Sequence, residues 1–205
     1  MTDRPILFSG PMIEALLARR KTQTRRLCRH ANDEHLVHVV QIDVPSEPGW
    51  FGDEEGDVRF FSGYAPGDRL WVREAWRTHK AYDDLKPSEL GGEETVWPEL
   101  DRDNCDYHGR YRHGRFMPRW ASRLTLVVTD VRVQRLQAIT LGDICAEGLG
   151  SSIYDFKPVQ RAFDAWIALW DSINGEGAWA RNPWVTAVSF DVRKGNIDNL
   201  EAAHG

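Results

Sequence analysis

The residues best suited to chemistry are Lys-Thr-Gln-Thr-Arg-Arg at 21–26, next to an expected first helix. As a helix, this run would bring Lys21 and Arg25 to one side. As a strand, it would place Thr24 and Arg26 on the face opposite Lys21 and Arg25. Either arrangement gathers donors and nucleophile-type groups that suit an anionic or polar ligand. The alternative interpretation is a solvated basic face.

The charge is unevenly distributed along this chain of 205 residues, whose formal net charge is −5. Residues 31–57 hold eight acidic residues and no lysine or arginine, and residues 81–106 hold nine acidic and two basic residues. These segments take 17 of the 31 acidic and 2 of the 26 basic residues, which leaves 14 acidic and 24 basic residues elsewhere. The basic remainder allows a positive site for a nucleotide or RNA, but it argues against a broad DNA-coating surface.

Hydropathy and cysteine usage indicate a cytoplasmic protein without a membrane partner. No stretch approaches the roughly 18 apolar residues of a membrane span, and the N-terminal Met-Thr-Asp-Arg lacks a signal-peptide core. The three cysteines are too few for a disulfide framework. The sequence leaves the oligomeric state open.

Turn signals and hydrophobic periodicity predict an α+β fold with a small mixed or barrel-like sheet. Gly10-Pro11 begins a helix expected to end near Arg20, and an extended segment follows at 22–28. Further strands are expected at 69–76, 111–117, 123–136 and 184–192, and further helices at 141–147 and 158–171.

Two polar segments, residues 31–63 and 77–110, are interpreted as loop-like insertions. We expect a single domain over residues 1–195 that contains both of them. Residues 196–205 would then form a flexible tail.

The run from Leu16 to Arg26 resembles the opening signature of ASCH-domain proteins, which have a PUA-like β-barrel fold. Further segments look like later parts of this family in the same order: 66–74, 123–148 and 182–192. The resemblance covers most of residues 4–30, 64–76 and 115–193, and both insertions fall outside it. Residues 4–8 and 115–123 look like the larger members carried by phages and prophages. One departure is Arg19, where family members often have glycine.

The resemblance implies a catalytic set. Some small ASCH proteins are amidohydrolases that remove the acetyl group from N(4)-acetylcytidine, using a Lys-x-x-Thr pair and a glutamate on the helix after the long strand. Carried over by motif, these positions are Lys21, Thr24 and Glu147. Other relatives are regarded as RNA-binding modules, and ribonuclease activity has been ascribed to some.

Amide hydrolysis needs an activated nucleophile, a proton shuttle and stabilisation of a tetrahedral oxyanion. Thr24 can supply a hydroxyl or orient a water, and burial near two arginines would lower the pKa of Lys21 from its reference value of about 10.4. Glu147 can accept the proton or hold the exocyclic nitrogen of a cytosine. The alternatives are a charged helix end beside an ordinary strand residue for Lys21 and Thr24, and a common helix terminus for Glu147.

Charged residues elsewhere are candidates for substrate binding. Arg25, Arg26 and Arg73 can face an oxyanion or a phosphate. Glu74 is a competing carboxylate next to Arg73 at a strand end, where an ion pair is the alternative role.

The nine tryptophans are mostly expected to anchor the core. Trp76 and Trp120 are the candidates for stacking on a base, because polar or basic residues flank both.

We expect neither a metal nor a cofactor. Two groups of cysteine and histidine residues contain no Cys-x-x-Cys knuckle: Cys28, His30, His35 and His38, and Cys105, His108 and His113. No Gly-x-Gly-x-x-Gly or Walker-type phosphate loop is present either.

The residues and the resemblance together favour a nucleoside- or RNA-base-binding ASCH protein that deacetylates N(4)-acetylcytidine or a related acylated nucleoside. Three alternatives stay open. These are a noncatalytic RNA- or DNA-binding module of phage origin, a ribonuclease, and a protein-binding role in which the acidic insertions mimic nucleic acid.

Overall fold

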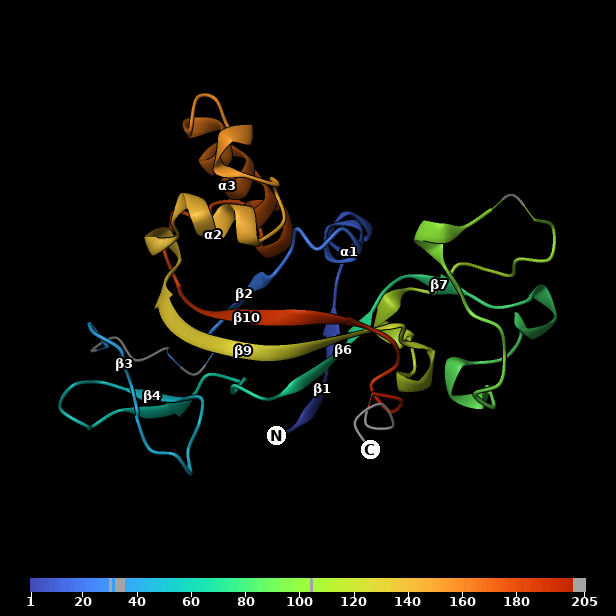
Figure 1. The fold of residues 1–205 in the computed structure, drawn as a ribbon, viewed down its shortest axis with the longest axis horizontal. Helices are drawn as coiled ribbons and strands as arrows, with labels where there is room; N and C mark the ends of the chain where they lie inside the picture. Colours follow the sequence, from blue (N-terminus) through green and yellow to red (C-terminus); the bar gives the residue numbers. More distant parts are fainter. Residues whose placement is uncertain (30, 32–35, 104, 201–205) are drawn as a thin grey trace. The chain divides into compact units, whose positions relative to one another are not determined.

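The computed structural model describes residues 1–29, 31, 36–103 and 105–200 (Figure 1). The chain divides into two compact units built from separated segments. The first unit holds residues 18–68 and 128–191, and the second holds residues 2–17, 69–127 and the chain from 192 onward. Part of the expected tail, residues 201–205, lies outside the described residues.

The principal sheet is mixed and has five strands in the order β1-β6-β9-β10-β2. Their bounds are β1 Asp3–Leu7, β2 Gln23–Leu27, β6 Arg69–Arg73, β9 Leu124–Arg135 and β10 Trp184–Lys194. β1 is parallel to β6, whereas β6 with β9 and β2 with β10 form antiparallel pairs. With the few helices of the described residues, this sheet confirms the predicted α+β class.

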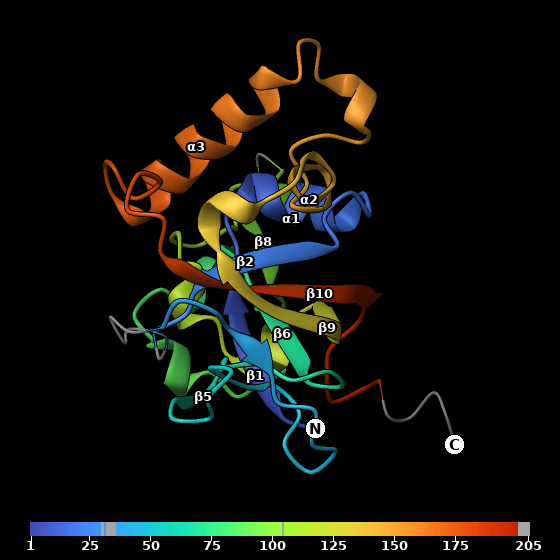
Figure 2. The same ribbon diagram turned by 90° about the vertical axis from the view of Figure 1, so that its left-hand side faces the viewer.

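In the first unit, helices α2 (Leu141–Ala146) and α3 (Gln160–Asn174) lie on the side of β2 that faces away from β10 (Figure 2). α2 begins at a capping box: the Thr140 hydroxyl accepts from the Asp143 N–H, and the Asp143 carboxylate accepts from the Thr140 N–H. Gly148 follows the helix with φ +94°, a conformation that favours glycine.

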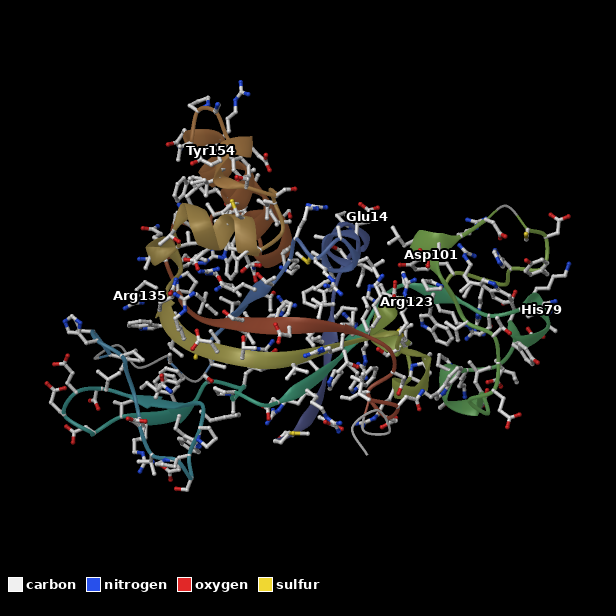
Figure 3. The ribbon with its side chains drawn as sticks, in the orientation of Figure 1. Glu14, His79, Asp101, Arg123, Arg135 and Tyr154 are labelled. Atoms are coloured by element: carbon white, nitrogen blue, oxygen red, sulfur yellow. The ribbon has the colours of Figure 1, made fainter. Side chains whose placement is uncertain are left out.

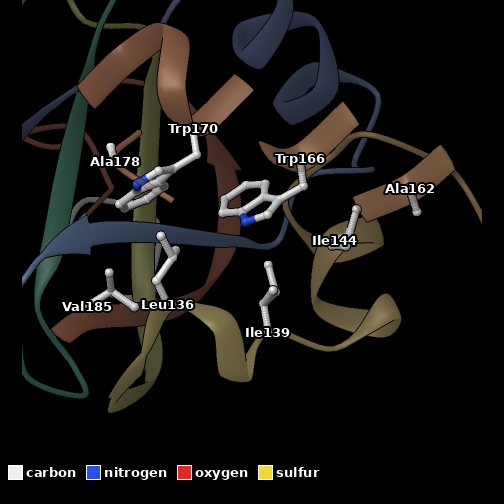
Figure 4. Close-up of a cluster of buried hydrophobic side chains, with 8 residues drawn as sticks. All are labelled: Leu136, Ile139, Ile144, Ala162, Trp166, Trp170, Ala178 and Val185. Atoms are coloured by element: carbon white, nitrogen blue, oxygen red, sulfur yellow. The ribbon is translucent and has the colours of Figure 1, made fainter. Parts of the chain in front are cut away.

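One buried hydrophobic cluster of the first unit lies under α3 (Figure 4). Ala162, Trp166 and Trp170 recur every four residues, so they form one buried stripe along the helix. They pack against α2, the start of β10 and the turns that follow β9 and α3, through Leu136, Ile139, Ile144, Ala178 and Val185. Phe163 and Ile167 are half-buried at the margin of this stripe.

The first insertion differs from the irregular loop that the sequence predicts. It contains a three-stranded antiparallel sheet of β3 (Val40–Gln41), β4 (Trp50–Gly52) and β5 (Arg59–Phe61). Phe51 pairs with Phe60 across β4 and β5, with ring centroids 6.4 Å apart. Cross-strand aromatic pairs stabilise such short strands. The two partners of such a pair lie too far apart in sequence for hydrophobic periodicity to predict that they meet.

In the second unit, helix α1 (Gly10–Leu17) follows β1, and the second insertion is mostly irregular, as predicted. A two-stranded pair joins β7 (Trp76–Arg77) to β8 (Trp97–Pro98). The predicted strand at 111–117 is wrong, because a 3-10 turn occupies Gly114–Phe116. A Cβ atom at Gly114 would lie 2.8 Å from both Leu7 Cδ1 and the Glu74 carbonyl carbon, so the close approach requires glycine.

No helix among the described residues combines the length and the apolar character that crossing a membrane requires.

Candidate functional site

Lys21 and Glu147, which are 126 residues apart in sequence, are in direct contact in the first unit. The Lys21 Nζ atom donates one hydrogen bond of 2.8 Å to Glu147 Oε2 and another of 2.9 Å to the Glu147 carbonyl oxygen. The side chains of Lys21 and Glu147 are 0% and 3% exposed. An amine and a carboxylate are therefore held within proton-transfer distance and away from solvent.

The end of α2 positions this pair. The last carbonyl groups of a helix have no partner within it. Here the residues that precede β2 supply the donors: Arg20 Nη1 bonds to the Gly148 oxygen at 2.8 Å, and the Thr22 N–H bonds to the Ala146 oxygen at 2.8 Å. Between them, Lys21 bonds to the carbonyl oxygen of Glu147. These hydrogen bonds to the backbone at the end of α2 hold Lys21 and Glu147 next to each other.

β2 separates the remaining polar residues onto its two faces, as the strand interpretation predicts. Arg25 Nη1 donates to Gln23 Oε1 at 2.6 Å, so these two side chains share one face. Arg26 Nη1 donates to Thr24 Oγ1 at 2.7 Å, so these two share the other. Because Arg25 also contacts Glu147, the Gln23–Arg25 face is the one that joins the Lys21–Glu147 pair.

Arg25 links two carboxylates. Its Nη1 atom lies 3.1 Å from Glu147 Oε1, and its Nη2 atom lies 3.1 Å from Asp143 Oδ2. Its guanidinium carbon lies 5.9 Å from the centre of the Trp166 ring, which lies beside β2 (Figure 4). The Arg25 side chain is fully buried, and buried charges of this kind persist when they are paired.

Asp143 continues the network toward the surface. Burial raises its pKa, but hydrogen bonds from Thr140 and Arg132 and the charge of Arg25 outweigh this effect and lower the pKa to about 2. Arg132 Nη2 donates to Asp143 Oδ1 at 3.0 Å, and its side chain is 45% exposed. Positive and negative groups therefore alternate from buried Lys21 to half-exposed Arg132.

The protonation of Lys21 depends on opposing effects. Burial lowers its pKa below the usual range, Glu147 raises it, and the charges of Arg26 and Arg25 lower it further. The net direction is downward, so more of this amine is neutral near neutral pH than an exposed lysine would be. A neutral amine beside a carboxylate can accept a proton and pass it on.

Thr24 is buried on the face of β2 opposite Arg25. Its hydroxyl oxygen accepts the hydrogen bond from Arg26, which leaves the hydroxyl hydrogen available for donation to a base. The site therefore contains two direct side-chain hydrogen bonds, one between Lys21 and Glu147 and the other between Thr24 and Arg26.

Arg73 and Glu74 belong to the second unit. The predicted ion pair of Glu74 exists, but its partner is Arg123 and not the adjacent Arg73, with bonds of 2.8 and 3.0 Å. Arg123 also binds Asp101 (Figure 3). Arg73 instead lies over the Trp71 ring at 4.4 Å and donates to the Arg115 carbonyl oxygen. Neighbouring strand residues point to opposite faces, which separates Arg73 from Glu74.

Trp76 and Trp120 also lie in the second unit. Trp76 is 0% exposed and packs with Leu90 and Met117. This burial favours a core role, and the expectation that Trp76 stacks on a base stays a prediction. Trp120 is half-buried against the same cluster, and its predicted role in stacking stays a prediction.

Sequence reasoning missed Gln23, Asp143, Arg132 and Trp166 as parts of the network around Lys21. Asp143 had a usable signal, since it completes the capping box that begins at Thr140. The strand pattern around Arg132 and the helix pattern around Trp166 predict only whether each side chain is buried or exposed. Their contacts depend on long-range packing.

Among the residues that the structure describes, no group of three or more histidine, cysteine or acidic residues is placed to hold a metal ion. His30 and His35, two of the metal ligands considered from the sequence, lie outside the described residues.

Comparisons with known proteins give one structural likeness. No family model and no curated protein match the chain. The chain is similar to the crystal structure of protein EF3133 from Enterococcus faecalis V583, of family model DUF984, at 11% identity and a TM-score of 0.38. This match covers 96% of the chain and 83% of that protein. A likeness this distant carries no argument, so the ASCH resemblance stays a prediction.

Proposed function

We propose that this chain is a PUA-like ASCH protein that binds a nucleoside or RNA base and hydrolyses the acyl amide of an acylated cytidine such as N(4)-acetylcytidine. The observation that supports this function best is the buried 2.8 Å hydrogen bond between Lys21 and Glu147. The barrel closure that a PUA-like fold implies is part of the same proposal.

In this mechanism an oxygen attacks the acyl carbonyl carbon, and it comes from Thr24 or from a water that Thr24 orients. Thr24 shares a face of β2 with Arg26, opposite the face that joins the Lys21–Glu147 pair, so a water relays the proton of the attacking oxygen to neutral Lys21. Glu147 shares that proton through its bond to Nζ. Arg26 stabilises the oxyanion. The carbon–nitrogen bond then breaks, and the shared proton passes to the exocyclic nitrogen of cytidine. If Thr24 is the nucleophile, water hydrolyses the resulting ester.

Incubation with N(4)-acetylcytidine, with release of acetate and cytidine followed over time, tests the proposal. We expect turnover by the wild type, a loss of at least about 100-fold in Lys21→Met and Glu147→Gln, and partial activity in Thr24→Ser. Circular dichroism of each variant excludes unfolding as the cause. Equal inactivity of the wild type and Lys21→Met would overturn the proposal.

A noncatalytic RNA- or DNA-binding module is the second candidate. The observation that favours it is the burial of Lys21, Thr24 and Glu147, since paired and buried charges also occur as purely structural networks. This function predicts binding to single-stranded RNA that weakens with salt and in Arg26→Ala, without release of acetate. Cleavage of that RNA would instead indicate a ribonuclease.

A further inference from the structure

We propose that Arg25 is a positioning residue: it holds one carboxylate oxygen of Glu147 so that the other oxygen faces Lys21. The catalytic meaning of this role rests on the proposed hydrolysis. The role itself is a property of the folded protein and can be measured without substrate.

Each oxygen of the Glu147 carboxylate has its own cation. Arg25 Nη1 binds Oε1 at 3.1 Å, and Lys21 Nζ binds Oε2 at 2.8 Å. A carboxylate held at one oxygen only is free to rotate about its terminal bond, because that torsion is broad. The Arg25 contact therefore determines how Oε2 is presented to Lys21.

Arg25 is fixed by residues of three elements. Gln23 of β2 accepts its Nη1 bond at 2.6 Å, and Gln23 Nε2 in turn donates to Ser189 Oγ of β10 at 3.2 Å. Asp143 of α2 contacts its Nη2 atom at 3.1 Å and is held by the capping box with Thr140. A guanidinium group is planar and binds at several positions in fixed directions. Arg25 thus provides a rigid support that a single ammonium group cannot reproduce.

The charges that act on Lys21 predict a measurable consequence. Glu147, the residue directly after α2, favours the protonated amine, whereas Arg25 and Arg26 of β2 oppose it. Replacing Arg25 by lysine keeps this opposing charge but no longer holds Glu147 Oε1, so Glu147 stabilises protonated Lys21 less well. Lys21 should then titrate at lower pH than in the wild type.

The test combines Arg25→Met, which removes the charge, with Arg25→Lys, which keeps the charge but loses the planar group. The chain has five lysines, so their side-chain NMR signals can be assigned and titrated individually. Arg135→Met is the matched control, because Arg135 is an exposed arginine of β9 that stacks on Trp184 at 4.3 Å (Figure 3). We expect Lys21 to titrate at lower pH in Arg25→Lys than in the wild type or Arg135→Met, and at higher pH in Arg25→Met than in Arg25→Lys.

Rates with N(4)-acetylcytidine supply the second readout. Both Arg25 variants should lose about 100-fold in kcat, as is typical of misplaced catalytic groups. The pH limb due to Lys21 should follow the NMR titration in each variant. A folded Arg25→Lys with a wild-type Lys21 titration overturns the inference. If Arg25→Lys does not fold, a wild-type kcat in Arg25→Met overturns it.

Failure of the proposed function is recognised separately. A wild type that does not deacetylate refutes hydrolysis, while the lysine titration still decides whether Arg25 sets the state of Lys21.

Discussion

The N–H of Thr22 donates a 2.8 Å hydrogen bond to the carbonyl oxygen of Ala146, and this bond joins the entrance of β2 to the end of α2. Arg20 and Lys21 bind the next carbonyl groups along the chain, those of Gly148 and Glu147. Lys21 is therefore a helix-capping group as well as the candidate base. Variants of Lys21 must be judged for stability as well as for activity.

The Lys21–Glu147 pair should show strong energetic coupling. Lys21→Met leaves the buried Glu147 carboxylate with Arg25 alone, and we expect it to lower the free energy of unfolding by about 3–5 kcal/mol. The double variant Lys21→Met/Glu147→Gln should lose less than the sum of the single losses. Urea unfolding of the four proteins measures this difference.

The exposed pair of Lys86 and Glu89 is the matched control for this double-mutant cycle of Lys21 and Glu147. Their charged atoms lie 3.9 Å apart, and the side chains are 78% and 48% exposed. Solvent screens such a pair, so the Lys86→Met/Glu89→Gln cycle should give a coupling close to zero. Equal coupling in both cycles would contradict the importance of burial for Lys21 and Glu147.

Asp143 should make the protein sensitive to acid. Its pKa of about 2 in the folded state lies below its ordinary value of 3.8, so its ionised form stabilises the fold above pH 3.8. This contribution should disappear as the pH falls from 3.8 toward 2. Asp143→Asn should therefore be less stable at neutral pH and should lose less stability over that acidic interval.

Urea midpoints measured between pH 2 and 7 test the role of Asp143. Asp130→Asn is the control, since Asp130 lies 3.5 Å from the same Arg132 but is 55% exposed. We expect this control to follow the wild-type curve. The same acid response in Asp143→Asn and the wild type would show that Asp143 does not cause the loss.

Arg19→Gly should stabilise the protein. Arg19 has φ +56° just after α1, a left-handed conformation that costs a residue with a side chain about 1 kcal/mol. Glycine adopts it readily, so the net gain should be about 0.5 kcal/mol after the larger entropy loss of glycine. Arg29→Gly, at an exposed turn residue without positive φ, should give no gain in a thermal unfolding comparison. A lower stability of Arg19→Gly would contradict the strain argument.

Trp76 should matter for folding and not for binding a base. Trp76→Ala removes a fully buried side chain and should cost about 3–5 kcal/mol in the free energy of unfolding. Trp120→Ala, at a half-buried position in the same cluster, should cost less. Urea unfolding compares the two variants, and a stable Trp76→Ala would contradict the core assignment.

The sequence by itself determined the elements whose signals are local. Thr140 and Gly148 mark the two ends of α2, because a cap and a left-handed glycine act within one helical turn. Likewise, β-branched residues predict β9, and the spacing of Trp166 and Trp170 predicts the buried face of α3. The alternation of residues 23–26 also follows from strand geometry alone.

Tertiary structure decided which of these side chains meet. The distance from Lys21 to Glu147 and the choice of Arg123 as the partner of Glu74 both depend on contacts between segments far apart in sequence. The burial of Trp76 and the aromatic pairing of Phe51 with Phe60 also depend on contacts that form only in the folded chain. Local preference fixes the direction in which a side chain leaves its strand or helix. Only the packing of distant elements fixes what that side chain touches, and here it turns a basic run at residues 21–26 into a buried, paired network.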